Sequence, residues 1–77
     1  MTFLLQVSNT EIFDYLSIHN KNLLYWHHEF ADAIHEIFRD SVYYENNFVY
    51  AKTESDIVAA SLHIFGAIRP YSEGGNK

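Results

Sequence analysis

The chain is short, acidic and free of cysteine: it has 77 residues, ten acidic side chains against five basic ones, and a formal net charge of −5. This length accommodates one domain, and the absence of cysteine excludes disulfides and thiolate zinc sites. The negative charge disfavours binding to phosphate backbones and to anionic membranes, and it suits a basic surface on another protein.

The N-terminal part of the sequence predicts a strand followed by a helix. The apolar run over residues 2–7 is bounded by turn-forming residues, as in a short strand. Ser8 and Glu11 have the spacing of a capping box, in which each side chain bonds the backbone N–H of the other residue. We therefore expect a helix over residues 9–18, followed by a turn in the polar stretch 19–22.

The clearest predicted element is an amphipathic helix over residues 23–40, with Asn20 or Asn22 as its N-cap. Its apolar side chains share one broad face, and this face includes His27, which we expect to be hydrogen-bonded in the core or to line a groove. The acidic side chains gather on the other side of the helix: Glu29, Asp32, Glu36 and Asp40. Such a row is typical of a solvated outer face, and it would also attract a basic partner.

The sequence after this helix predicts a β-hairpin over residues 42–51, because β-branched and aromatic residues flank Asn46 and Asn47. Three aromatic side chains would share one face of the ribbon: Tyr43, Phe48 and Tyr50. Tyrosine is common both at interfaces and in ordinary strands. In the alternative interpretation the helix continues through Tyr44, and a single strand runs from Phe48 to Lys52.

The C-terminal part predicts a third helix over residues 54–68, with Thr53 as its N-cap and Pro70 beyond its end. This helix is apolar almost all round, so it must be covered on all sides, by the rest of the chain or by a second copy. Gly66 costs about 1 kcal/mol in a helix interior, which favours close packing there. Residues 71–77 are expected to form a flexible tail.

These elements define an α+β fold in the order β-α-α-β-β-α. We expect a single domain over residues 1–70, with a three-stranded antiparallel sheet and the helices packed on one of its faces. A small helical bundle with a short β-ribbon is the alternative.

The sequence carries no catalytic or cofactor motif, so we expect a non-enzymatic protein-binding module without a cofactor. A small acidic inhibitor or adaptor would dock on a basic surface, such as the nucleic-acid-binding groove of a larger protein. The acidic row of the second helix would steer this partner, and the hairpin aromatics would anchor it. Homodimerisation through the third helix is compatible with this function. We expect a cytoplasmic protein, because neither a secretory leader nor a membrane-spanning run is evident.

Two alternative functions come from other classes of protein. His28, Asp32 and His35 lie on one side of the second helix, and histidine and carboxylate are ligands of zinc. His19 and His63 would join such a metal site only if the fold brought them near. The other alternative is a self-assembling structural protein. Two helices followed by a hairpin also resemble the layout of a winged-helix DNA binder, but its recognition helix would be the acidic one.

Overall fold

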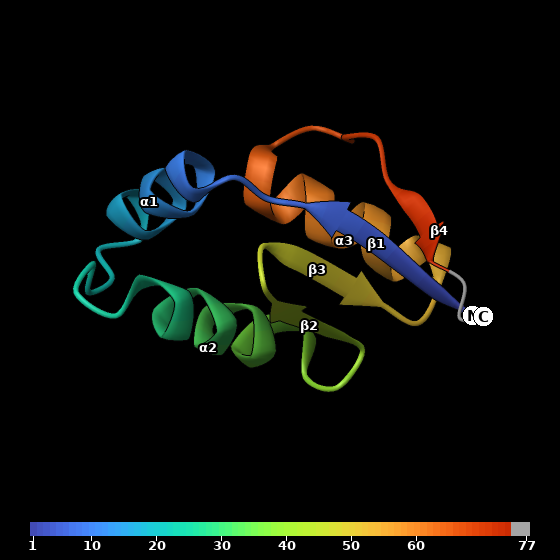
Figure 1. Ribbon diagram of the computed structural model, residues 1–77, viewed down its shortest axis with the longest axis horizontal. Coiled ribbons are helices and arrows are strands. Elements are labelled where there is room, and N and C mark those ends of the chain that lie inside the picture. The colour runs from blue at the N-terminus through green and yellow to red at the C-terminus, as the bar shows by residue number, and fades with distance from the viewer. Residues whose placement is uncertain (75–77) are drawn as a thin grey trace.

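Four antiparallel strands and three helices make up the computed structural model, which describes residues 1–74 (Figure 1). The elements, in chain order, are β1 (Thr2–Gln6), α1 (Asn9–Ile18), α2 (Trp26–Phe38), β2 (Val42–Glu45), β3 (Phe48–Ala51), α3 (Glu54–Phe65) and β4 (Ser72–Gly74). The predicted α+β fold is confirmed.

The sheet has four strands in the order β2-β3-β1-β4, so the predicted three-stranded sheet is wrong. The additional strand β4 pairs with β1, with Gly74 opposite Thr2. A Cβ atom at Gly74 would lie 2.8 Å from two carbons of the Leu4 side chain, so glycine makes room for Leu4 at this edge. A three-residue strand is too short to show alternation in sequence. It lies in the segment that we expected to form a tail, and residues 75–77 lie outside the described part of the chain.

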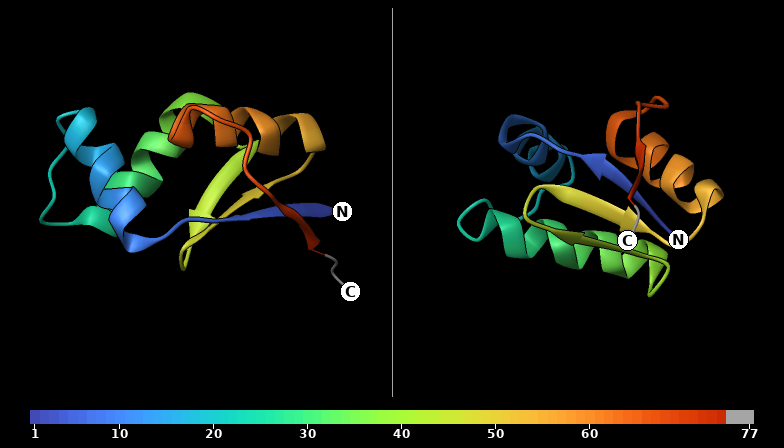
Figure 2. Two further views of the ribbon diagram at one scale, coloured as in Figure 1. Left: turned by 90° about the horizontal axis from the view of Figure 1, so that it is seen from above. Right: turned by 45° about the vertical axis from the view of Figure 1, so that its right-hand side comes forward.

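Helices α2 and α3 lie on one side of the sheet, and α1 lies beyond the end of the strands, next to α2 (Figure 2). Helix α2 packs on β2, α3 packs on the three strands β1, β2 and β3, and α1 packs on α2. The buried apolar side chains between these layers form one cluster: Leu5, Val7, Ile12, Tyr15, Leu16, Phe30, Ala33, Ile34, Val42, Val49, Ala51, Ile57 and Ala60. In the described part of the chain, no helix packs on the opposite face of the sheet.

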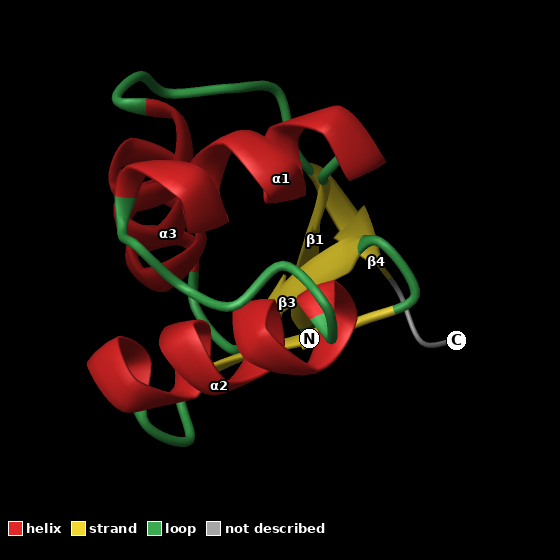
Figure 3. Cartoon of the chain, turned by 90° about the vertical axis from the view of Figure 1, so that its left-hand side faces the viewer, coloured by secondary structure: helices red, strands yellow, loops and turns green. Residues whose placement is uncertain are grey.

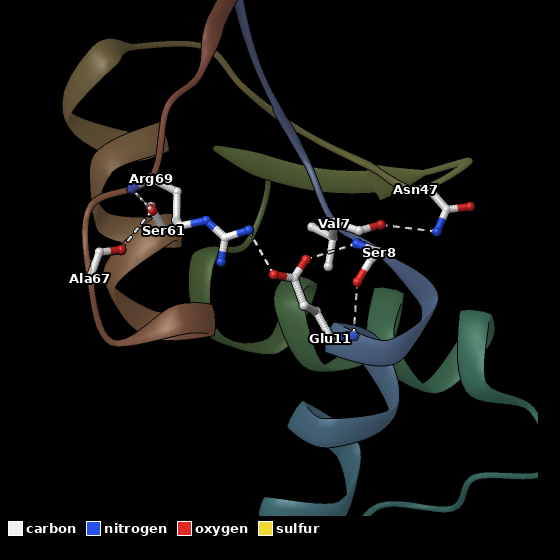
Figure 4. Close-up of polar contacts among 7 residues, drawn as sticks. All are labelled: Val7, Ser8, Glu11, Asn47, Ser61, Ala67 and Arg69. Carbon is white, nitrogen blue, oxygen red and sulfur yellow. Dashed lines mark hydrogen bonds and ion pairs between the residues drawn. The ribbon is translucent and has the colours of Figure 1, made fainter.

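Helix α1 has the predicted bounds and the predicted capping box. The Ser8 hydroxyl accepts from the Glu11 N–H over 3.1 Å, and the Glu11 carboxylate accepts from the Ser8 N–H over 2.9 Å. Figure 4 shows both bonds where β1 passes into α1. The two side chains satisfy backbone donors that the helix itself leaves free, which fixes the start of α1.

Helix α2 is shorter than the predicted span 23–40, and neither Asn20 nor Asn22 caps it. The side-chain oxygen Oδ1 of Asn22 instead accepts from the Leu24 N–H over 2.8 Å and forms a turn within the connection. The connection returns from the end of α1, so that Trp26 contacts Phe13 with ring centroids 4.8 Å apart. The apolar periodicity continued through the connection and therefore did not reveal the start of the helix.

The predicted hairpin and its faces are confirmed, so the helix does not continue through Tyr44. Asn46 and Asn47 have φ angles of 53° and 69°, the left-handed conformations of a tight hairpin turn. Tyr43 lies opposite Tyr50, and Tyr44 lies opposite Val49. The Asn47 side chain also donates to the Val7 carbonyl over 3.0 Å, which ties the turn to the start of α1.

Helix α3 ends at Phe65, before the predicted position 68. Gly66 has a φ of 72° and forms the left-handed C-cap, so the prediction of a tightly packed glycine inside the helix is wrong. A Cβ atom at Gly66 would meet nothing within 4 Å, which leaves backbone conformation as the reason for glycine at this position. The buried Ser61 hydroxyl then donates to the Ala67 carbonyl over 2.8 Å and accepts from the Arg69 N–H over 2.7 Å.

Candidate interaction surfaces and the histidine cleft

Three consecutive large apolar side chains are exposed in the connection between α1 and α2. Leu23, Leu24 and Tyr25 keep 43%, 73% and 62% of their surface accessible. Figure 3 shows the connection as a loop that crosses from the end of α1 to the start of α2. Leu24 and Tyr25 also line a shallow hollow of about 240 Å³ together with the first turn of α2. Exposed apolar side chains gathered in this way are typical of an interaction site.

Acidic side chains of α2 lie next to this loop. The Lys21 ammonium is 3.8 Å from the Glu36 carboxylate, which places the loop beside the acidic side of the helix. Asp32 is exposed like Glu36, and Glu29 is half-buried. The hollow beside Leu24 and Tyr25 extends to His28, which lies 3.3 Å from Asp32, so the apolar loop adjoins this side of α2. We call these residues together the loop surface: Leu23, Leu24, Tyr25, Glu29, Asp32 and Glu36.

Within residues 1–74, the ion pairs between the acidic side chains of α2 and histidines are exposed to solvent. Asp32 lies 3.3 Å from His28, and Asp40, just beyond the helix, lies 3.6 Å from His35. Exposed pairs of this kind contribute little to stability, and a histidine contributes charge only when it is protonated. The carboxylates are therefore accessible to a partner.

The candidate metal ligands do not converge. His28 contacts Asp32, whereas His35 lies against Asp40. Among residues 1–74, no group of three or more histidine and acidic side chains could hold a metal ion. The helical spacing placed these residues on one side of α2, but it did not bring three ligand atoms to one point.

His27 is hydrogen-bonded, as expected, although it is exposed and lies outside the core. Its Nδ1 lies 2.5 Å from the Tyr44 hydroxyl, and its ring stacks on Trp26 with centroids 3.7 Å apart. Burial raises the pKa of the Tyr44 hydroxyl, so this group stays protonated and can donate to the imidazole. His27 therefore fastens the start of α2 to the hairpin.

The hairpin aromatics lie on the side of the sheet without helices. The Tyr43 and Tyr50 rings stack with centroids 4.8 Å apart and planes 7° apart, and Phe48 lies 6.4 Å from Tyr50. Tyr43 is 50% exposed. The sequence predicted these three residues and the acidic row as parts of one docking surface. In the structure the aromatics point away from the layer of helices that includes α2, so a flat partner contacting the loop surface would not reach them.

The sequence predicted cover for α3 from the rest of the chain or from a second copy, and the rest of the chain covers only part of this helix. Ile57 and Ala60 are buried against the sheet, whereas Ala59 is exposed and Leu62 keeps 47% of its surface accessible. The four-stranded sheet and α2 thus leave one side of this apolar helix open.

A cleft of about 390 Å³ between α1 and the end of α3 gathers side chains that are distant in sequence. Tyr15 and His63 form a hydrogen bond of 2.7 Å, and the His19 ring lies 4.2 Å from the Tyr15 ring. Burial lowers the pKa of His63 below its ordinary value, and the neighbouring His19 lowers it further. Burial raises the pKa of the Tyr15 hydroxyl, and Glu36 adds to this effect. No local pattern could have indicated the cleft, because its residues come from two helices joined only by the fold.

An ion pair borders this cleft, between Glu11 and Arg69 at 2.7 Å (Figure 4). Burial by itself would raise the pKa of Glu11, but hydrogen bonds from Ser8 and Arg69 outweigh it and hold the pKa below its ordinary value. Arg69 also lies over the Phe65 ring at 4.0 Å. Glu11 and Arg69 therefore neutralise each other at the border of the cleft.

Comparison of the chain with protein-family models, with curated proteins and with solved structures found no match. Among the residues that the structure describes, no helix has the length and apolar character that crossing a membrane requires.

Proposed function

We propose that this chain is a non-enzymatic protein-binding module that docks its loop surface on a basic surface of a larger protein. The observation that carries the proposal is the exposure of Leu23, Leu24 and Tyr25 beside the carboxylates of α2. At typical interfaces a few well-buried anchor side chains, among which tyrosine is enriched, contribute most of the binding free energy.

The charge of the chain indicates the chemistry of the partner. A net charge of −5 on 77 residues favours a basic protein, such as one with a nucleic-acid-binding groove. Asp32 and Glu36 would raise the association rate by long-range attraction, and their contribution would decrease with salt. A domain that occupies such a groove would act as an inhibitor or adaptor. The absence of cysteine suits the reducing cytoplasm, where we place this activity.

The apolar residues of the loop would anchor the complex. Leu24 and Tyr25 project from the connection, and they border the hollow at the first turn of α2. The partner would receive these two side chains in a pocket and insert an apolar side chain into the hollow. Tyrosine suits this role because it offers a large contact area at a low cost in side-chain entropy.

Affinity capture from the native cell, with the immobilised full chain as bait, tests this proposal. We expect one basic protein to be retained, and its binding to the bait to be measured by titration after purification. The double variant Leu24→Ser, Tyr25→Ser should abolish retention. The double variant Asp32→Asn, Glu36→Gln should weaken it and reduce its dependence on salt.

Two control variants match these substitutions elsewhere on the surface. Ile68→Ser removes an exposed apolar side chain outside the loop, and Asp14→Asn with Glu73→Gln removes two exposed charges outside α2. Both controls should retain the partner as the original chain does. If the loop variant and Ile68→Ser retain the partner equally, or if no protein is retained by the original chain, the loop surface is not a docking site.

A further inference from the structure

The open face of the sheet presents a central apolar row. Leu4, Tyr50 and Tyr43 lie side by side across β1, β3 and β2, because Leu4 pairs with Tyr50 and Tyr50 pairs with Tyr43. The next row toward the hairpin turn holds Gln6, Phe48 and Glu45 by the same pairing. The view in Figure 2 shows the helices on the other side of these strands. Four large apolar side chains thus lie on the open face, where Tyr43 is half exposed and the other three are partly exposed: Leu4, Tyr43, Phe48 and Tyr50.

The charges on this face cancel, in contrast to the chain as a whole. Glu45 lies at the hairpin turn. Lys52 follows β3 at the other end of the hairpin, where its N–H donates to the Ser41 carbonyl over 3.3 Å. By strand alternation, continued by one residue beyond β3, these are the two charged side chains that the paired strands place on the open face within residues 1–74. Two copies with net charges of −5 repel each other in most orientations, but this face presents no net charge to a second copy.

The positions of the two charges also make the face complementary to itself. A two-fold axis between two such faces, perpendicular to the strands, lays the central row of one copy on that of the other. The same rotation brings the Glu45 end of each hairpin over the Lys52 end of its partner. Two sheets can pack face to face in this manner about 10 Å apart with their side chains interdigitated.

We propose that the chain forms a two-fold symmetric homodimer through this open face, with a second copy of the chain as its occupant. Tyr43 and Tyr50 form the centre of the interface, and Glu45 and Lys52 set the relative orientation of the two copies. This interface lies away from the loop surface, so each copy in the dimer keeps its loop surface free. A test that refutes the dimer therefore leaves the proposed docking function unaffected, and the reverse is also true.

Sedimentation equilibrium of the full chain, from micromolar to submillimolar concentration, tests the proposal. We expect a particle of twice the chain mass of 9.0 kDa that dissociates on dilution. Tyr43→Lys should produce a monomer, because it places two like charges against each other at the two-fold axis. Tyr43 is half exposed, so the variant should still fold, and its circular dichroism spectrum checks this.

Exchanging the charges of Glu45 and Lys52 tests their contact across the dimer interface separately from any effect on folding. Glu45→Lys and Lys52→Glu should each weaken the dimer by about tenfold or more, since each brings like charges together across the axis. The double variant should restore the dimer, and an equal mixture of the two single variants should form a heterodimer. Failure of both to associate would overturn the proposed orientation.

The matched control is Leu62→Lys on the outer side of α3, where the exposed fraction is 47%. The dimer should persist in this variant. A dimer that Leu62→Lys disrupts and Tyr43→Lys leaves intact would place self-association on the third helix instead. A monomeric mass at every concentration would show that no second copy binds the open face, and it would overturn the inference.

Discussion

The substitution Ser61→Ala tests whether one buried hydroxyl holds the C-terminal segment against α3. Ser61 is fully buried, and its hydroxyl bonds two backbone groups, the Ala67 carbonyl and the Arg69 N–H (Figure 4). Alanine would leave both groups without this partner, at a cost of roughly 1–3 kcal/mol for each group that water does not reach. The higher helix propensity of alanine offsets about 0.5 kcal/mol of this cost.

We therefore expect Ser61→Ala to lower the free energy of unfolding by about 2 kcal/mol. In a domain of this size, such a loss corresponds to a decrease of about 10 °C in the midpoint of thermal unfolding. Urea and thermal denaturation followed by circular dichroism measure both quantities. Amide hydrogen exchange should also become faster at Arg69, since its N–H loses its acceptor.

Ser55→Ala is the matched control, because Ser55 is exposed in the first turn of the same helix. Its hydroxyl lies 3.4 Å from that of Thr53, a distance at which a hydrogen bond is weak. We expect this variant to change the free energy of unfolding by less than about 0.5 kcal/mol. Equal losses for Ser61→Ala and Ser55→Ala would refute the assigned role of the buried hydroxyl.

The histidine cleft makes stability depend on pH, because burial lowers the pKa of His63 below the ordinary histidine value of 6.5. The contribution of His63 to stability should be complete above that pH and fall as the pH decreases through it. His63→Gln should reduce this slope in urea titrations, and an unchanged slope would assign the dependence to other groups. Ser8→Ala should cost about 1 kcal/mol by removing half of the capping box, again measured by urea unfolding. At the hairpin turn, Asn46→Gly should be neutral or stabilising, whereas Asn47→Gly should destabilise by about 1 kcal/mol because it loses the bond to Val7. Equal effects of the two glycine variants would contradict this role of the Asn47 side chain.

Local signals in the sequence predicted most of the elements. The capping box at Ser8 fixed the start of α1, and Thr53 fixed the start of α3, because both caps act within one turn of the chain. Asn46 and Asn47 predicted the hairpin, since few other residues adopt left-handed backbone at low cost. The alternation that followed from this turn placed Tyr43 and Tyr50 on one face.

The errors concern features that depend on distant parts of the chain. Strand β4 exists because Ser72–Gly74 meets the free edge of β1, and its own residues carry no strand pattern. Helix α2 starts at Trp26 because the connection has to return along α1 before Trp26 can meet Phe13. The apolar residues before Trp26 continued the helical period, so they were assigned to the helix instead of an exposed loop.

For the candidate surfaces, too, some features followed from local sequence and others depended on how the elements pack. The sequence by itself determined the composition of the acidic row and of the aromatic ribbon, because helical and strand periods assign side chains to faces. Only the tertiary structure decided that these groups point to different sides of the molecule, that Leu23 to Tyr25 are exposed, and that His19 meets His63. The physical reason is that the helical or strand period determines which side chains of one element point the same way. The packing of the elements against one another then determines what those side chains face.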